Sequence, residues 1–227
     1  MTEVPQETTE ALLEQGQRLA RLAQSKVLLE DYPGAIEDQL GAISRAQDAL
    51  ARVEADSSVP ADERKECAHR LSDYWGRLGG IYRRDGKVPE GIAAYGHGKE
   101  IEQRYQLDDS YNRTNWIVLT LLQDPAQLGA LDPEINEAID LIRAQVQGPR
   151  RDQWWAWADL GLVCQLGGRV READEAYAHF RQAGARPADY ESVLPVLKQL
   201  QAKFEPSELA TRLGKTIRTL KTPDGSG

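Results

Sequence analysis

The sequence predicts an all-α protein, a right-handed superhelical solenoid of antiparallel helix pairs with about ten helices. Apolar residues recur at three- and four-residue steps along nearly the whole chain, which is the spacing of an amphipathic helix. No stretch alternates apolar and polar residues between turn signals, as a half-buried strand would. Short turns rich in Pro, Gly, Asp and Ser separate the helical stretches, so consecutive helices are expected to pair.

The N-terminal half contains five helix patterns with clear start and stop signals. Pro33 can open the second helix, because Pro is tolerated in a first helical turn. Asp85 and Gly86 end the third helix, and the side chains of Asp108 and Asp109 offer capping oxygens to the fifth. The expected helices span residues 10–29, 35–50, 61–84, 88–105 and 111–122.

The C-terminal half continues in the same way. Asp132 is expected to cap a helix that has Pro133 at its first position, and Asp152 is expected to cap the next one. Pro195 predicts a late start or a kink in the ninth helix. The expected helices span residues 133–146, 153–166, 171–182, 189–204 and 207–220. The polar ends, residues 1–9 and 221–227, are expected to be disordered.

Composition and charge exclude several classes of protein. The chain is 41% hydrophobic and 28% charged, which is ordinary for a folded domain, and its formal net charge of -8 disfavours general nucleic-acid binding. No stretch approaches the roughly 20 apolar residues of a membrane span, and the N-terminus lacks the layout of a signal peptide. Cys67 and Cys164 stand alone within helix patterns, so we expect two buried free thiols and a cytoplasmic location.

Two blocks of the chain share the same internal spacing. The first block contains Trp75, Leu78, Gly79, Tyr82, Gly91, Tyr95 and Gly98. The second contains Trp157, Leu160, Gly161, Cys164, Ala173, Tyr177 and Phe180. The tryptophan and leucine of each block are expected to point into the helix pair, while the small residues allow the second helix to approach closely. Each aromatic on the second helix is expected to fill the gap to the next pair.

The first block closely resembles the tetratricopeptide-repeat (TPR) signature, W-x2-L-G-x2-Y followed by small and aromatic residues. The second block departs from it at Cys164, where an aromatic is usual. The resemblance covers residues 10–183 as about four helix pairs, of which the first and third are degenerate, and residues 184–220 are expected to cap the open end.

A finer resemblance rests on the string Asp109-Ser110-Tyr111-Asn112-Arg113-Thr114-Asn115-Trp116, together with residues 151–154 and 158–160. These residues look like a bacterial subgroup of the repeats that is proposed to act as the sensor in conflict and signalling systems. The resemblance implies that the chain regulates or recruits a separate effector.

Motifs for catalysis or metal binding are missing from the sequence. Residues 80–87 miss the phosphate-loop spacing by one residue and lie in a helix pattern. His69, His97 and His179 have no partner at zinc-ligand spacing, and no serine stands in G-x-S-x-G. We therefore expect no enzyme activity, no cofactor and no metal.

The resemblance implies a concave groove lined by the first helix of each pair. The candidate binding residues on these helices are Asp73, Arg77, Arg83, Arg84, Asn112, Arg113, Asn115, Trp155 and Asp159. Arginine suits carboxylates or phosphates, and asparagine can bond the backbone of an extended peptide. The alternative is that Arg83 and Arg84 only form surface pairs with Asp73, Asp85 or Glu90.

Three glycines within one expected helix, Gly91, Gly96 and Gly98, also allow two interpretations. They permit either close helix packing or access of a ligand to bare backbone. The sequence as a whole predicts an interaction or regulatory adaptor that binds a peptide or helix of a partner protein in the groove. The alternative is a sensor domain for a small anionic signal such as a nucleotide.

Overall fold

The structure, a computed structural model, describes residues 7–183 and 186–221. These residues form ten α-helices and one 3-10 turn and include no strand, which confirms the predicted all-α fold. The chain divides into two compact units, unit 1 at Met1–Trp116 and unit 2 at Ile117–Gly227.

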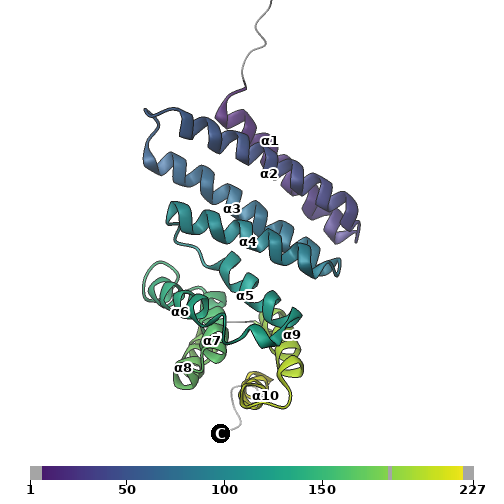
Figure 1. The fold of residues 1–227 in the computed structure, drawn as a ribbon, viewed down its shortest axis with the longest axis vertical. Coiled ribbons are helices and arrows are strands. Elements are labelled where there is room, and N and C mark those ends of the chain that lie inside the picture. Colours follow the sequence, from purple (N-terminus) through teal and green to yellow (C-terminus); the bar gives the residue numbers. More distant parts are fainter. Residues whose placement is uncertain (1–6, 184–185, 222–227) are drawn as a thin grey trace, which may run out of the picture. The chain divides into compact units, whose positions relative to one another are not determined.

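Unit 1 is a series of long helices in which each packs against the next (Figure 1). Its elements are α1 (Thr9–Leu28), α2 (Tyr32–Ala55), α3 (Ala61–Arg84), α4 (Val88–Tyr105) and the beginning of α5 (Tyr111–Gln123). Helices α1 and α2 pair, as do α3 and α4, and α2 packs against α3. The core between them is made largely of alanines and leucines, which lets long helices lie close together.

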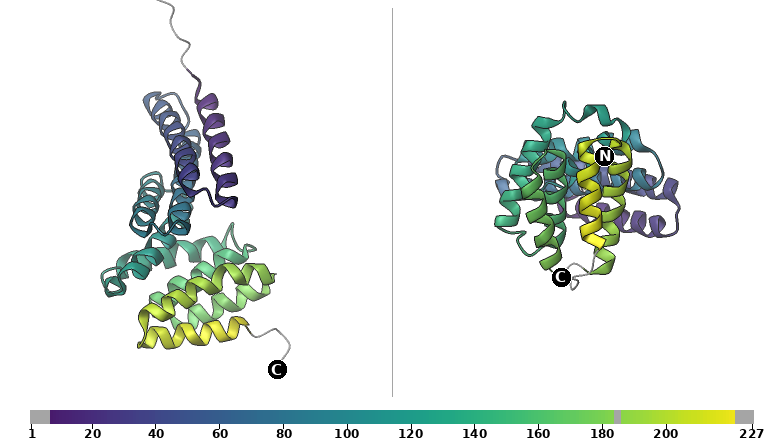
Figure 2. Two further views of the ribbon diagram at one scale, coloured as in Figure 1. Left: turned by 90° about the vertical axis from the view of Figure 1, so that its right-hand side faces the viewer. Right: turned by 90° about the horizontal axis from the view of Figure 1, so that it is seen from below.

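Unit 2 contains the end of α5 and the remaining helices (Figure 2). Its elements are the 3-10 turn η1 (Pro125–Gln127), α6 (Asp132–Gln147), α7 (Trp154–Leu166), α8 (Val170–Gln182), α9 (Pro187–Phe204) and α10 (Glu208–Lys221). Helix α7 packs between α6 and α8, and α9 pairs with α10. Helix α10 also contacts α7 and α8, so the last pair lies against the preceding one.

Several helix ends differ from the expectation. Thr8 caps α1 by accepting a hydrogen bond from the Ala11 amide at 3.2 Å, so the helix begins at Thr9 and not at residue 10. Asp132 is the first residue of α6 instead of its cap, and Gln153 takes the cap position expected for Asp152. Helix α9 starts at Pro187 and runs through Pro195. The expected tails at residues 1–6 and 222–227 lie outside the described residues.

The glycines of the two repeat blocks allow the close approach that their spacing predicts, but each aromatic ring packs against the glycine of its own helix pair, whereas it was expected to fill the gap to the next pair. A Cβ atom added to Gly79 would lie 2.8 Å from the ring of Tyr95, and one added to Gly161 would lie 2.8 Å from the ring of Tyr177. Both tyrosines are buried. The glycine on the first helix therefore leaves the space that the aromatic of the second helix occupies. This close approach at glycine is the one that the tetratricopeptide-like spacing of the two blocks predicts, and it is present in both units.

Both cysteines are free and buried, as expected. Burial raises the pKa of the Cys67 thiol and raises the pKa of the Cys164 thiol to about 12. No helix in the described part of the chain is both long and apolar enough to cross a membrane.

The adjacent glycines of α3 give a matched test of the close helix approach. Gly79→Ala should lower the free energy of unfolding by about 1–3 kcal/mol, because the new methyl group overlaps the Tyr95 ring. Gly80→Ala should be neutral or stabilising by up to about 1 kcal/mol, because its methyl group would lie 3.5 Å from the nearest atom while alanine favours the helix. Urea unfolding of the two variants measures the difference, and equal stabilities would contradict the packing argument.

Candidate functional site

The candidate residues of α3 form one stripe along the helix. Asp73, Arg77, Gly80 and Arg84 follow one another at three- and four-residue steps, so they share a face. Asp73 and Arg77 are exposed and form an ion pair with 2.7 Å between Oδ2 and Nη2. An exposed pair of this kind contributes under about 1 kcal/mol to stability and can open to accept a partner.

Arg84, on this stripe, and its neighbour Arg83 carry charges that no carboxylate of the described residues neutralises. Within the described residues neither arginine forms an ion pair, and both are exposed. The guanidinium of Arg84 donates from Nη1 to the carbonyl of Gly80 at 3.3 Å. Asp85 pairs with Lys87 at 2.7 Å, and among the described residues the alternative surface pairing with Arg83 or Arg84 is not formed.

Asn112 is a correction to the predicted groove. Its side chain is only 1% exposed and lies in the interior of unit 1. Its Nδ2 donates to Oε1 of Glu102 at 2.6 Å and to the Ser72 hydroxyl at 3.0 Å. The expectation that this amide is open to a partner peptide was wrong, because a buried amide needs internal partners. Arg113 is also buried, with 6% exposure.

Asn115 stays partly exposed at the surface of α5. Its Nδ2 donates to the backbone carbonyl of Tyr111 one turn earlier, at 2.9 Å. The ring of Tyr111 is 43% exposed and meets the ring of Tyr95 edge to face, with 6.1 Å between centroids. Sequence reasoning missed Tyr111. The signal was available, because Tyr111 lies four residues before Asn115 and therefore on the same face of the helix.

Trp155 and Asp159 lie one turn apart on α7 in unit 2, and both are partly exposed. The guanidinium carbon of Arg150 lies 4.9 Å from the centroid of the Trp155 ring, a cation–π contact. The ring of Trp155 thus faces an arginine of its own unit.

A groove on unit 2 runs between α6 and α8 over the first turns of α7. It consists of two adjoining hollows of about 770 Å³ and 640 Å³, which share Val146, Gln147, Trp157 and His179. The rings of Trp157 and His179 stack at 4.3 Å between centroids, and the indole Nε1 donates to the Arg151 carbonyl at 2.7 Å. Because that bond satisfies the indole N–H, the tryptophan offers an apolar ring to the groove.

The repeat tryptophans are less buried than expected. Trp75 and Trp157 were both predicted to lie in the core, but each is only partly buried and its ring contacts a histidine of the following helix, tilted for Trp75 and stacked for Trp157. Trp75 lies 4.6 Å from His97 by ring centroids. Trp157 therefore belongs both to the packing of the pair and to the lining of the groove.

The two ends of the groove differ in charge. In the smaller hollow, Arg143 binds Glu172 through two hydrogen bonds of 2.8 and 3.1 Å, which holds the pKa of that carboxyl below its usual range. In the larger hollow, Arg151 and Asp152 are exposed, and among the described residues neither has an ion-pair partner. The smaller hollow is held by internal pairs, whereas the larger one keeps a free guanidinium and the amides of Gln147 and Gln182.

The described residues include no group of three or more histidines, cysteines or acids placed to hold a metal ion. The groove also lacks an activated nucleophile, because the nearest thiol, Cys164 of α7, is fully buried and its pKa is raised to about 12. The arrangement is suited to binding by stacking, hydrogen bonds and charge.

The thiols give a direct test of this chemistry. At pH 8 a thiol-reactive dye should modify neither Cys67 nor Cys164 in the native chain within minutes, because the thiolate is the reacting species and both are buried. The same dye should modify both thiols in guanidinium chloride, which serves as the control. Rapid stoichiometric labelling of the native chain would contradict the assignment of inert core cysteines.

No family model matches the chain, and no curated protein matches it. Among solved structures, BtubC (BKLC) from P. vanneervenii is similar at 14% sequence identity, with 94% of this chain and 88% of that chain covered and a TM-score of 0.43. The TPR-like repeats of a putative kinesin light chain from Podosopora anserina are similar at 18% identity, with 95% and 97% covered and a TM-score of 0.43. The TPR-like pairing described above rests on the geometry of this chain itself.

Proposed function

We propose that this protein is a non-catalytic interaction scaffold that binds an extended segment of a partner protein. The observation that carries the proposal is the groove of unit 2, with the stacked Trp157 and His179 at its centre. Two adjoining hollows along one pair of helices suit a linear chain better than a compact molecule. Their volumes lie in the range of about 300–1,000 Å³ that is usual for ligand sites.

The lining of the larger hollow matches a peptide. Gln147 and Gln182 each offer an amide that can both donate to and accept from a peptide backbone. The Trp157 ring provides an apolar contact of the kind that anchors interfaces, and Arg151 can bind a carboxylate of the segment through two hydrogen bonds. The exposed face of unit 1 that carries Arg77, Arg83, Arg84, Tyr111 and Asn115 offers a second contact surface.

In this proposal the chain recruits or controls a separate effector, in keeping with its resemblance to the bacterial sensor subgroup. The buried free cysteines are compatible with a reducing cytoplasm. The unneutralised charges of Arg83 and Arg84 favour one second candidate, a sensor that binds a small anion such as a nucleotide on α3.

Peptide selection tests the groove. We expect a peptide selected on the full chain from a random library to lose at least about tenfold in affinity when Arg151 and His179 are both replaced by Ala. Lys198→Ala, an exposed change on α9 of the same unit, should leave the affinity unchanged. Fluorescence polarisation measures both. Undiminished binding by the groove variant would refute the groove as the site.

A second pair of substitutions tests the face of unit 1. Replacing Arg83 and Asn115 together by Ala should leave the melting temperature nearly unchanged, because both side chains make few internal contacts. If this face binds the partner, the affinity falls in this variant. Melting the wild-type chain with a nucleotide panel separates the second candidate, since a ligand of the folded state raises the midpoint. A raised midpoint that the double variant abolishes would favour the anion sensor over the scaffold.

A further inference from the structure

We propose that Ser72, Glu102 and Asn112 form a proton-controlled latch that holds the first turns of α5 against α3 and α4. The latch is closed when the Glu102 carboxyl carries its proton and loosens when that carboxyl ionises. Its three members come from three different elements: Ser72 from α3, Glu102 from α4 and Asn112 from α5.

The latch has a defined shape. The side chain of Asn112 fills a slot between two glycines: a Cβ atom at Gly76 would lie 2.7 Å from its Oδ1, and one at Gly98 would lie 2.3 Å from its Cγ. Close packing is therefore the reason for Gly98, as one of the two interpretations of these glycines expected. A side chain held in such a slot fixes the helix that carries it.

The hydrogen bonds of the latch meet at one atom. Oε1 of Glu102 accepts from Asn112 Nδ2 at 2.6 Å and from the Ser72 hydroxyl at 3.1 Å. Asn112 Nδ2 also donates to the Ser72 carbonyl at 3.2 Å, so the amide ties α5 to both neighbouring helices. Oε2 of Glu102 and Oδ1 of Asn112 are buried and have no hydrogen-bond partner within residues 7–183 and 186–221. A proton on Oε2 leaves the carboxyl neutral, whereas its loss leaves a buried negative charge that only the donors of Asn112 and Ser72 offset among the described residues.

The surroundings of Glu102 disfavour that charge. The side chain is 5% exposed, and burial raises the pKa of its carboxyl to about 7. Asp109 in the turn before α5 acts in the same direction, while the bonds from Asn112 and Ser72 oppose it. Asp109 itself lies 3.6 Å from His69 of α3.

Charged groups next to the latch on α4 interact with residues outside it. On α4, Arg104 and Tyr105 both bond the Glu54 carboxylate of α2, and Lys99 lies over the ring of Trp116. On α5, Arg113 is buried.

The stability of the closed latch depends on pH because the Glu102 carboxyl binds its proton more tightly in the folded state than when exposed. The folded latch holds its proton up to about pH 7, whereas an exposed Glu102 would lose it near 4.5. The protonated latch is therefore fully favoured below about pH 4.5, and its stability is lost as pH rises through about 7. The opening equilibrium should increase up to about tenfold per pH unit within this window. Because Tyr111 and Asn115 lie on the same turns as Asn112, the latch sets whether this part of the unit 1 face is ordered.

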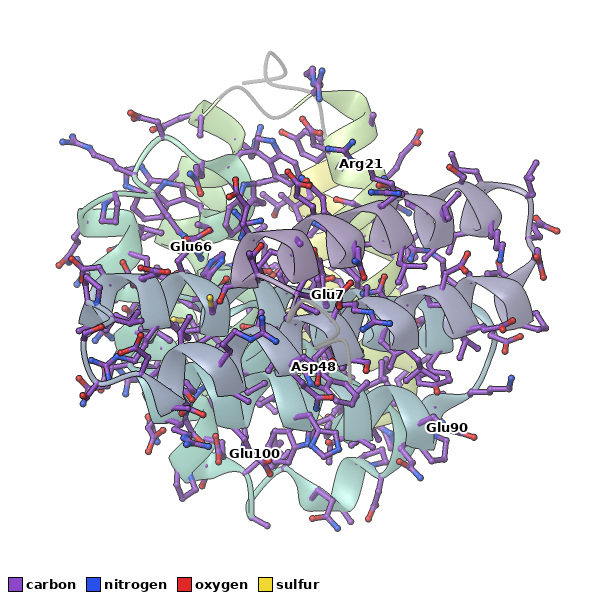
Figure 3. The ribbon with its side chains drawn as sticks, turned by 90° about the horizontal axis from the view of Figure 1, so that it is seen from above. Glu7, Arg21, Asp48, Glu66, Glu90 and Glu100 are labelled. Carbon is purple, nitrogen blue, oxygen red and sulfur yellow. The ribbon has the colours of Figure 1, made fainter. Side chains whose placement is uncertain are left out.

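Hydrogen exchange of the full chain tests the latch. After correction for intrinsic rates, the amides of residues 113–116 should lose at least about tenfold protection between pH 5.5 and pH 8. Glu102→Gln, which mimics the neutral carboxyl, should remove this dependence. Glu100→Gln is the matched control on α4, since Glu100 is 73% exposed and is labelled in Figure 3, and it should behave like the wild type. An unchanged dependence in Glu102→Gln, or none in the wild type, would overturn the latch.

A measurement on the wild-type chain keeps the test valid if Glu102→Gln fails to fold. The side-chain carboxyl carbon of Glu102 can be followed by NMR across the pH range. A midpoint near pH 7, accompanied by shifts of the Asn112 side-chain amide, supports the latch. A midpoint near the ordinary value of 4.5 would overturn it.

Discussion

Close approach of helices at glycine is the constraint on which the rest of the structure depends. The rings of Tyr95 and Tyr177 fill space that a Cβ atom at Gly79 or Gly161 would occupy. A glycine inside a helix costs about 1 kcal/mol relative to alanine, and burial of a whole aromatic ring offsets this cost. The spacing of the pairs α3–α4 and α7–α8 is thereby fixed at one point. The positions of the stripe on α3 and of Trp155 and Asp159 on α7 follow from that spacing, because those helices cannot rotate without displacing the rings.

This constraint explains which parts of the structure were predictable from sequence. Gly79 and Tyr95 are the same distance apart in the chain as Gly161 and Tyr177, and each contact joins adjacent helices across one short turn. A contact of that kind leaves a repeated spacing in the sequence. Asn112 produces no repeated spacing in the sequence, because the space that its side chain fills is formed by Gly76 and Gly98 on two other helices. Asn112 and Asn115 are the same residue type on one helix, yet one is interior and the other lies at the surface.

The groove of unit 2 was missed for a related reason. The spacing placed Trp157 in the core, whereas its ring is only partly buried and borders a hollow. That placement is set by the bond from the indole N–H to the Arg151 carbonyl in the loop before α7. A tryptophan has a large apolar body and one polar atom that needs an acceptor. A tryptophan in the first turn of a helix can donate to a free carbonyl of the preceding loop, and this bond favours a position at the surface. The place of Trp157 in the sequence was therefore the signal for a ring at the surface.

Stability alone does not account for the cluster of Ser72, Glu102 and Asn112. A buried ion pair or polar network is often no more stable than apolar residues of similar volume, and this cluster leaves two oxygens without a hydrogen bond. An aliphatic side chain at Glu102 would remove one of those oxygens and the cost of burying an acid. The polar arrangement does something that an apolar one cannot, because its free energy depends on a single proton. It places that dependence where α5 meets α3 and α4, so the order of one helix, rather than the stability of the whole unit, responds to pH.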